Sequence, residues 1–356
     1  MMKKVYINSV GSISSQKTFD NDEFLNDIIN YHTTNISVVN PNYKEYLDAG
    51  SARRMAKGIK MGVVASKIAM DEAGVESVDA VITGTGMGCV IDSEKFVSRL
   101  IDNNEEYLTP TSFIQSTHNT VGGQIALGIQ CKGYNFTYVH SSSSFESALI
   151  DAKLQLTLDE ASTILVGGID ELGPHMIQVH GLIKHIKQEK TIDNLAILNS
   201  GTEGAVFSEG ANFFVLSNGK ENTCYAELVD VEILNTLSKE RLEQQVRSFL
   251  NQNKMTINDV DVIVLGNNGD VSFDEYYSVL TNGLFKNTQH TAYKHLSGEF
   301  KTVSSFGFWL GAKMLKTQSI PQIVKLNDNA PKAIKNVLIY NQYRGENHTF
   351  VMLRTC

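Results

Sequence analysis

Apolar segments with the length of strands alternate with segments of helical periodicity along this chain. Residues 55–73 carry apolar side chains at helical spacing, and the helix that they predict ends at Gly74, a residue suited to a C-cap. The apolar segment 78–88 then runs into a glycine-rich turn. Further strands are predicted at 136–139 and 161–171, with an amphipathic stretch between them. The alternation predicts an α/β layered fold.

The same pattern occurs a second time at an offset of 182 residues, because VDAVITG begins at Val78 and VDVIVLG begins at Val260. Extended backwards without a gap, this offset also superimposes two helix-like segments. Their apolar positions coincide in three pairs: Val64 with Val246, Ile68 with Leu250, and Val75 with Ile257. The repeat predicts that the chain is built from two similar halves.

A second parallel supports the duplication, since a Ser-Phe pair opens a helix rich in small residues at 144–145 and again at 305–306. The polar, glycine-containing segment 217–225 has the composition of a linker. We therefore predict an N-terminal half of residues 1–220 and a C-terminal half of residues 221–356.

Composition and charge exclude some classes of function for this chain. The chain has 356 residues, 42% of them hydrophobic and 20% charged, which is ordinary for a globular protein. A net charge of −8 argues against binding nucleic acid or an anionic membrane through bulk charge. No segment reads as a signal peptide or a membrane span. The four cysteines are Cys89, Cys131, Cys224 and Cys356, and they lack CxxC spacing. We therefore expect neither a disulfide framework nor a zinc site, and we expect a cytoplasmic location.

Four segments carry recognisable motifs. Residues 110–152 contain a small-residue helix, a turn, a strand and then the serine-rich elbow HSSSS. The others are GTEGAVFSEGANFFVLSNG at 201–219, YKHLSGE at 293–299 and NQYRGENHTFVML at 341–353. In this order they resemble the nucleophile elbow, the GEGAG segment, the KSxxGH motif and the C-terminal strand pair of the β-ketoacyl synthases. The resemblance implies a thiolase-like fold, with two duplicated α/β halves in five layers, αβαβα.

The resemblance also implies a site, and this chain departs from it. In the family a cysteine thiolate at a helix N-terminus attacks an acyl thioester, and two histidines with a lysine support decarboxylation. Here the cysteine position falls on Ser142, the first histidine on Asn268 and the second on Glu299. The lysine is retained as Lys294, and the GFGG turn has become YRGE at 343–346. We predict that no intact catalytic site remains.

A chain of this kind resembles the chain-length-factor-type subunits of polyketide and aryl polyene ketosynthases. That resemblance implies a heterodimer with an active ketosynthase, in which this chain shapes the end of the acyl tunnel. Acyl carrier protein would dock mainly on the partner, and no cofactor would be needed. The strand at 136–139 would lie at the partner interface, which we expect to be broad and apolar.

Two other functions compete with this hypothesis. Ser142 could be the nucleophile of an acyltransferase or thioesterase, with His140 or Glu146 as its base. Alternatively, a homodimer could bind an acyl chain without processing it. The serine run also has a purely structural interpretation, because serine is favoured at helix N-caps.

The remaining candidates favour structural roles. His175, His180 and His185 are five residues apart, about 140° around a helix at each step, so we expect them to share no face. We interpret His118 and His140, which flank the predicted pocket, as packed residues. His295 stands one helical turn before Glu299 and could replace the missing histidine only through a local insertion. The GTGMG turn at 84–88 lacks the rest of a nucleotide-binding motif and predicts a tight turn.

Overall fold

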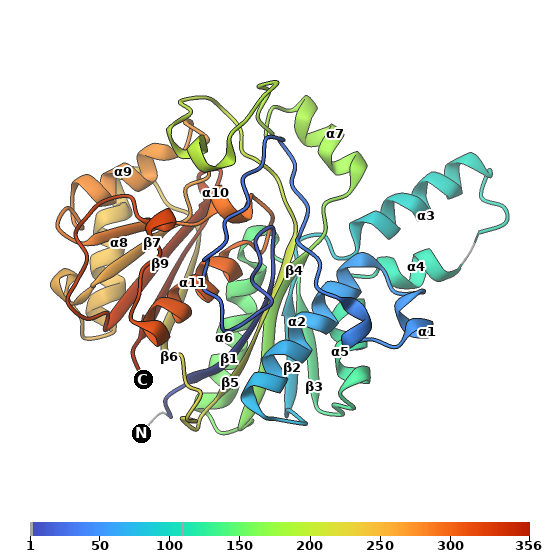
Figure 1. The fold of residues 1–356 in the computed structure, drawn as a ribbon, viewed down its shortest axis with the longest axis horizontal. Helices are drawn as coiled ribbons and strands as arrows, with labels where there is room; N and C mark the ends of the chain where they lie inside the picture. The colour runs from blue at the N-terminus through green and yellow to red at the C-terminus, as the bar shows by residue number, and fades with distance from the viewer. Residues whose placement is uncertain (1–2, 109) are drawn as a thin grey trace.

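The computed structural model describes residues 3–108 and 110–356 and shows a layered α/β molecule (Figure 1). Five strands belong to the first half: β1 (Tyr6–Ile13), β2 (Ala80–Gly84), β3 (Tyr134–Tyr138), β4 (Thr163–Asp170) and β5 (Gly210–Ser217). Five belong to the second: β6 (Ala226–Thr236), β7 (Val262–Leu265), β8 (Gln289–Ala292), β9 (Asn336–Tyr343) and β10 (Glu346–Arg354). The helices are α1 (Ala49–Ala52), α2 (Lys57–Ala73), α3 (Val90–Asp102), α4 (Pro110–Ser116), α5 (Thr120–Gly128), α6 (Ser144–Thr157), α7 (Pro174–Leu182), α8 (Lys239–Gln252), α9 (Asp274–Asn282), α10 (Lys294–Ser297) and α11 (Ser304–Thr317).

The strand order repeats between the halves. Read from each outer edge, it is β3-β2-β4-β5-β1 in the first half and β8-β7-β9-β10-β6 in the second. Each strand of the second half therefore stands where the strand five places earlier stands in the first, with the same parallel and antiparallel neighbours. The two sets join through only two residue pairs between β1 and β6. The predicted duplication is confirmed.

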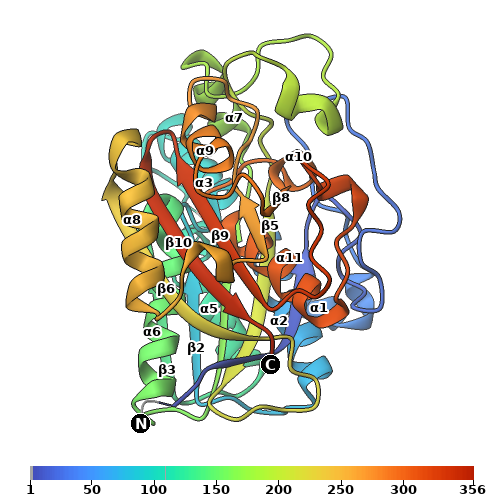
Figure 2. The same cartoon turned by 90° about the vertical axis from the view of Figure 1, so that its left-hand side faces the viewer.

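Helices complete the five layers. The outer face of the first sheet packs against α2 and α5, and that of the second packs against α8 and α9. Between the sheets lie α6 and α11, and α11 is buried from Ser304 to Leu315 because it has a sheet on each side. Figure 2 shows the second half face-on, with α8 beside β10 and β9.

The repeat found in the sequence coincides with real elements. Helices α2 and α8 begin at Lys57 and Lys239, at the predicted offset, and α6 and α11 begin at the two Ser-Phe pairs. Gly74 closes α2 in the left-handed conformation, with φ of 66°, as predicted. The predicted linker lies between the end of β5 and the start of β6. The boundary at residues 220 and 221 stays a prediction.

One pair of cysteines differs from the expectation. Cys224 and Cys356 form a disulfide, whereas Cys89 and Cys131 are free. The cause is the register of the sheet, since Arg354 of β10 pairs with Glu227 of β6 and the two flanking cysteines come side by side. Their separation of 132 residues hides this proximity in the sequence.

The structure offers neither a membrane span nor a metal cluster in its described part. Within residues 3–108 and 110–356, none of the helices has the length and apolar content needed to cross a bilayer. The same residues contain no group of three or more His, Cys, Asp or Glu side chains placed to bind a metal ion.

Candidate functional site

The elbow between β3 and α6 holds the serine run. Ser141 adopts a left-handed conformation, with φ of 53°, and a single 3₁₀ turn (Ser141–Ser143) leads into α6. Ser142 is buried, with 2% of its surface exposed, and its hydroxyl makes no hydrogen bond within the described part of the chain. The Ser142 side chain is therefore enclosed, and no described residue activates its hydroxyl through a hydrogen bond.

The hydroxyls of Ser143 and Ser144 form hydrogen bonds within the turn. The hydroxyl of Ser144 accepts from the amide of His140 at 2.8 Å and donates to the carbonyl of Ser141 at 2.7 Å. Ser143 stands at the N-cap of α6, but its hydroxyl donates to the carbonyl of His140 rather than capping a helix amide. The N-cap interpretation is thus wrong in detail, because these hydroxyls stabilise the elbow.

Neither candidate base hydrogen-bonds to Ser142. The Nδ1 atom of His140 lies 3.1 Å from the hydroxyl of Ser147. Glu146 is buried, and one of its carboxyl oxygens accepts from Thr349 at 3.0 Å. Burial raises the pKa of Glu146, which favours its neutral form. A protonated carboxyl group is a poor general base.

The structure brings Asn268, Glu299 and Lys294 into direct contact. The ammonium of Lys294 lies 3.1 Å and 2.9 Å from the two carboxylate oxygens of Glu299, and the Asn268 amide donates to the same carboxylate at 2.6 Å. The Lys294 and Glu299 side chains are only 1% and 3% exposed. This network pairs one cation with one carboxylate and contains no imidazole, so it lacks the group that supports decarboxylation in the family.

The turn that replaces GFGG is a tight hairpin between β9 and β10. Its central residues, Arg344 and Gly345, both have positive φ, 53° and 76°. The guanidinium of Arg344 pairs with Asp270 at 3.1 Å and lies over the ring of Phe273. The turn is therefore held to the loop that carries Asn268.

The same loop is held from a second side. The buried ammonium of Lys187 donates to the carbonyl of Gly269 at 3.0 Å and to Ser200 and Thr202. Sequence reasoning missed Lys187 because neither its motif nor its spacing marks it as close to Asn268. Only the tertiary fold joins these segments.

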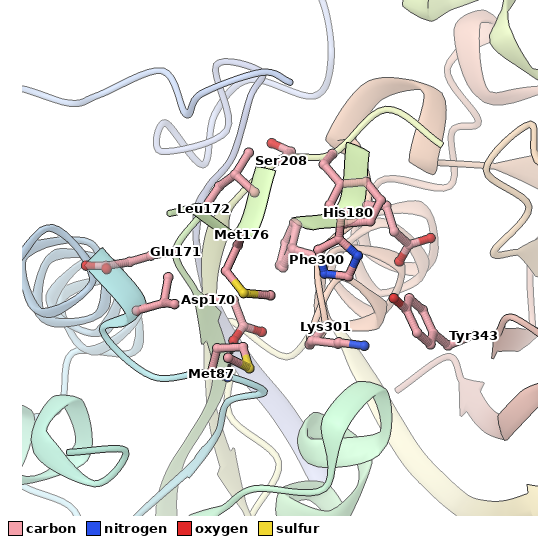
Figure 3. Close-up of a pocket in the computed structure, with 13 residues that line it drawn as sticks. Met87, Asp170, Glu171, Leu172, Met176, His180, Ser208, Phe300, Lys301 and Tyr343 are labelled. Atoms are coloured by element: carbon pink, nitrogen blue, oxygen red, sulfur yellow. Dashed lines mark hydrogen bonds between the residues drawn. The ribbon is translucent and has the colours of Figure 1, made fainter. Parts of the chain in front are cut away.

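A small pocket lies at the junction of the two halves (Figure 3). Residues of both halves line it, including Glu299, Lys301 and Tyr343 from the second half. The remaining lining residues are Met87, Val90, Asp170, Glu171, Leu172, Met176, His180, Phe207, Ser208 and Phe300. Ser142, His118 and His140 do not line this cavity, so the prediction that the two histidines flank a pocket at the elbow stays a prediction. Asp170 and Glu171 stand at the carboxyl end of the predicted strand 161–171, and this position was the one signal in the sequence that they line a site.

The Asp170 carboxylate accepts hydrogen bonds from the glycine-rich turn of the first half and from Thr302 of the second half. One carboxylate oxygen accepts from Thr85 and from the amides of Gly86 and Met87, at 2.8 to 3.1 Å. The other accepts from the amide and hydroxyl of Thr302, at 2.9 and 2.8 Å. These turn amides bind a side chain of this protein, so the prediction of a tight turn at 84–88 is confirmed.

The expectation that the three histidines share no face is wrong for one pair. Helix α7 ends at Leu182, and Lys184 turns the chain with φ of 57°. The Nδ1 atoms of His180 and His185 consequently lie 3.1 Å apart, whereas His175 faces Glu94. Burial lowers the pKa of His180 to about 4, so this ring is neutral near pH 7.

His295 does not replace the missing histidine. Its Nε2 atom lies 2.9 Å from the carbonyl of Ile323, and burial lowers its pKa to about 4. No insertion shifts it into the place of Glu299, which remains bound to Lys294. His295 is a buried residue bonded to the neighbouring segment.

Glu171, which also lines the pocket, predicts a pH dependence of stability. Burial raises its pKa from 4.5 to about 7, although the amides of Gly58 and Ile91 donate to its carboxylate. Because the folded-state pKa is the higher one, its stabilising effect is full below about pH 4.5 and is lost as the pH rises through about 7. The loss should be about 3 kcal/mol in the free energy of unfolding.

Urea unfolding from about pH 4.5 to about pH 8 measures this effect. The free energy of unfolding of Glu171→Gln, whose side chain cannot titrate, should fall by about 3 kcal/mol less over this pH range than that of the parent protein. The variant starts from lower stability, since an amide group can accept only one of the two backbone hydrogen bonds. Equal pH slopes in the two proteins would contradict the assignment.

Comparisons with known proteins agree with this geometry. The sequence model of the β-ketoacyl synthase N-terminal domain matches residues 8–222, more than half of the chain. No curated protein sequence matches. Among solved structures, a β-ketoacyl synthase from Burkholderia phymatum is similar with a TM-score of 0.80 and 15% identity, over 100% of both chains.

Two similar structures contain chain length factors. The ishigamide ketosynthase/chain length factor has a TM-score of 0.79 and 15% identity, over 100% of both chains. A ketosynthase in complex with its chain length factor, from Xenorhabdus doucetiae, has a TM-score of 0.78 and 14% identity, over 99% of this chain and 98% of that one. With the family model, the duplicated thiolase-like fold and the motifs in order, the chain belongs to the β-ketoacyl synthase family.

Proposed function

We propose that this protein is a non-catalytic, chain-length-factor-type subunit of a ketosynthase pair. It would associate with an active β-ketoacyl-acyl carrier protein synthase and shape the acyl tunnel in polyketide, polyene or fatty-acid-type biosynthesis. The substrate would arrive as an acyl carrier protein thioester, mainly through the partner, and this chain would need no cofactor. We expect the pair to work in the cytoplasm.

The observation that carries the proposal is the buried network of Lys294, Glu299 and Asn268. These are the positions that the motifs align with the family's lysine and histidines, and here the three side chains satisfy one another. Ketosynthase chemistry needs a thiolate and imidazoles that exchange hydrogen bonds with a reacting acyl group. A closed ion pair and an enclosed serine without a base support a role in shape rather than in chemistry.

The exposed surface around β3 supports a partner. Among the described strands β3 pairs with β2 alone, so its other edge has free backbone groups. Large apolar side chains are exposed on β3 and just after it, on the neighbouring α5, and on the α3–α4 hairpin, which projects from the body of the molecule (Figure 1). The exposed members are Val97, Ile101, Phe113, Ile114, Leu127, Tyr134, Phe136 and Val139. A patch of this kind favours a broad interface with another protein.

The acyltransferase or thioesterase alternative has weaker support, since Ser142 hydrogen-bonds to neither His140 nor Glu146. Ser142→Ala in the reconstituted pair is therefore expected to keep activity within about twofold, because no reacting group is lost. Product formation from acyl and malonyl carrier proteins measures it. A loss of about 100-fold or more, as for a removed nucleophile, would reject the non-catalytic proposal.

Purification decides between a heterodimer and the acyl-binding homodimer. We expect the tagged chain, taken from its native host, to carry a stoichiometric ketosynthase with an intact cysteine. Mass spectrometry and native molecular mass identify that partner. A homodimer without any such protein would favour acyl binding without processing.

A further inference from the structure

Lys301 extends into the pocket two residues after Glu299. Its aliphatic stem packs against Gly86, where an added Cβ atom would lie 2.3 Å from Cβ and Cγ of the lysine. Its ammonium nitrogen lies 3.6 Å from the centre of the Tyr343 ring (Figure 3). A glycine of one half and a tyrosine of the other thus set the position of this side chain.

The charged groups near Lys301 are already satisfied by other partners. Glu299 is bound by Lys294 and Asn268, and Asp170 accepts five hydrogen bonds from the two loops beside it. Arg344 pairs with Asp270. Within the described residues, the Lys301 ammonium has no ion pair or hydrogen bond, only its contact with the Tyr343 ring.

This arrangement leaves the Lys301 ammonium without a contacting counter-ion. An ammonium group has three N–H donors, and one ring face can receive only one of them. Burial lowers the pKa of Lys301, as expected for a desolvated cation that lacks a close counter-ion. The remaining donors require either water or a ligand with negative charge.

The pocket walls indicate what kind of anion fits. Apolar side chains dominate them: Met87, Val90, Leu172, Met176, Phe207 and Phe300. The neutral His180 ring also lines the pocket, with its Nδ1 atom bound to His185. The cavity is small, about 40 Å³, so the ligand must be short or must enter by one end. A carboxylate with a short aliphatic chain combines the required charge with an apolar body.

We propose that this pocket binds the carboxylate end of a short aliphatic acid, with Lys301 as its ion-pairing residue. The inference does not depend on the non-catalytic role, because it concerns a small ligand of this chain and no reaction. The ligand's carboxylate would supply the missing counter-ion.

Isothermal titration of the purified protein, with its partner if the two co-purify, tests the proposal. The probes are sodium butyrate and its neutral analogue butyramide, at constant ionic strength set with sodium chloride. We expect butyrate to bind, butyramide to bind at least about tenfold more weakly, and Lys301→Met to lose at least about tenfold in butyrate affinity. Lys301→Arg, which keeps the charge, should retain more affinity than Lys301→Met.

Lys95→Met is the matched control, because it removes the same charge from an exposed position on α3. It should bind butyrate as the parent protein does. Equal butyrate affinity in the parent protein and Lys301→Met, or equal binding of butyramide, would overturn the proposal. So would the absence of butyrate binding to a parent protein whose circular dichroism spectrum shows it folded. None of these results depends on whether a ketosynthase partner co-purifies.

Discussion

Phe136→Asp is expected to abolish association with the ketosynthase partner while leaving this chain folded. Phe136 lies on the free edge strand β3, has 46% of its surface exposed, and packs on Tyr134 and Tyr138. An aspartate there would place an unpaired charge at the centre of an apolar patch. We expect the dissociation constant to rise by a factor of about 100 or more, which corresponds to about 3 kcal/mol.

Size-exclusion chromatography and titration of the two purified chains measure this effect. The control is Leu182→Asp, since Leu182 is 85% exposed on α7 and lies outside the surface around β3. This variant should pair normally. If Phe136→Asp pairs as tightly as the parent chain, or if both variants fail equally, the surface around β3 is not the partner interface.

Lys294→Met is expected to destabilise the protein by about 3–5 kcal/mol. The substitution leaves the Glu299 carboxylate buried, with the Asn268 amide as its remaining hydrogen-bond donor and no cation. Removing one partner of a buried pair costs more than removing both, because the remaining charge stays desolvated. The double variant Lys294→Met, Glu299→Leu should therefore recover part of the loss.

Urea unfolding of the parent protein, both single variants and the double variant completes a double-mutant cycle. The coupling between the two positions should be large and favourable. Strict additivity would show that the two side chains do not act as a pair. That outcome would also weaken the proposed function, which depends on this network being closed.

The periodicity of the sequence was enough to predict the repeated halves. Apolar side chains at helical spacing in α2 and α8 and apolar runs in β2 and β7 are local properties, and their common offset links them without reference to contacts. The motif positions at Ser142, Asn268, Glu299 and Lys294 were likewise readable in order. That they correspond to the family's catalytic positions stays a prediction.

Proximity was decided by the tertiary structure alone. The disulfide between Cys224 and Cys356 depends on strand register, and the contact between His180 and His185 depends on where α7 ends. Lys301 lacks a contacting counter-ion because Lys294 pairs with Glu299 and because Asp170 faces the loop amides and Thr302. Short-range sequence patterns report which face of an element is buried. Which side chains share a pocket depends on how distant elements pack, and this packing becomes visible only in the folded structure.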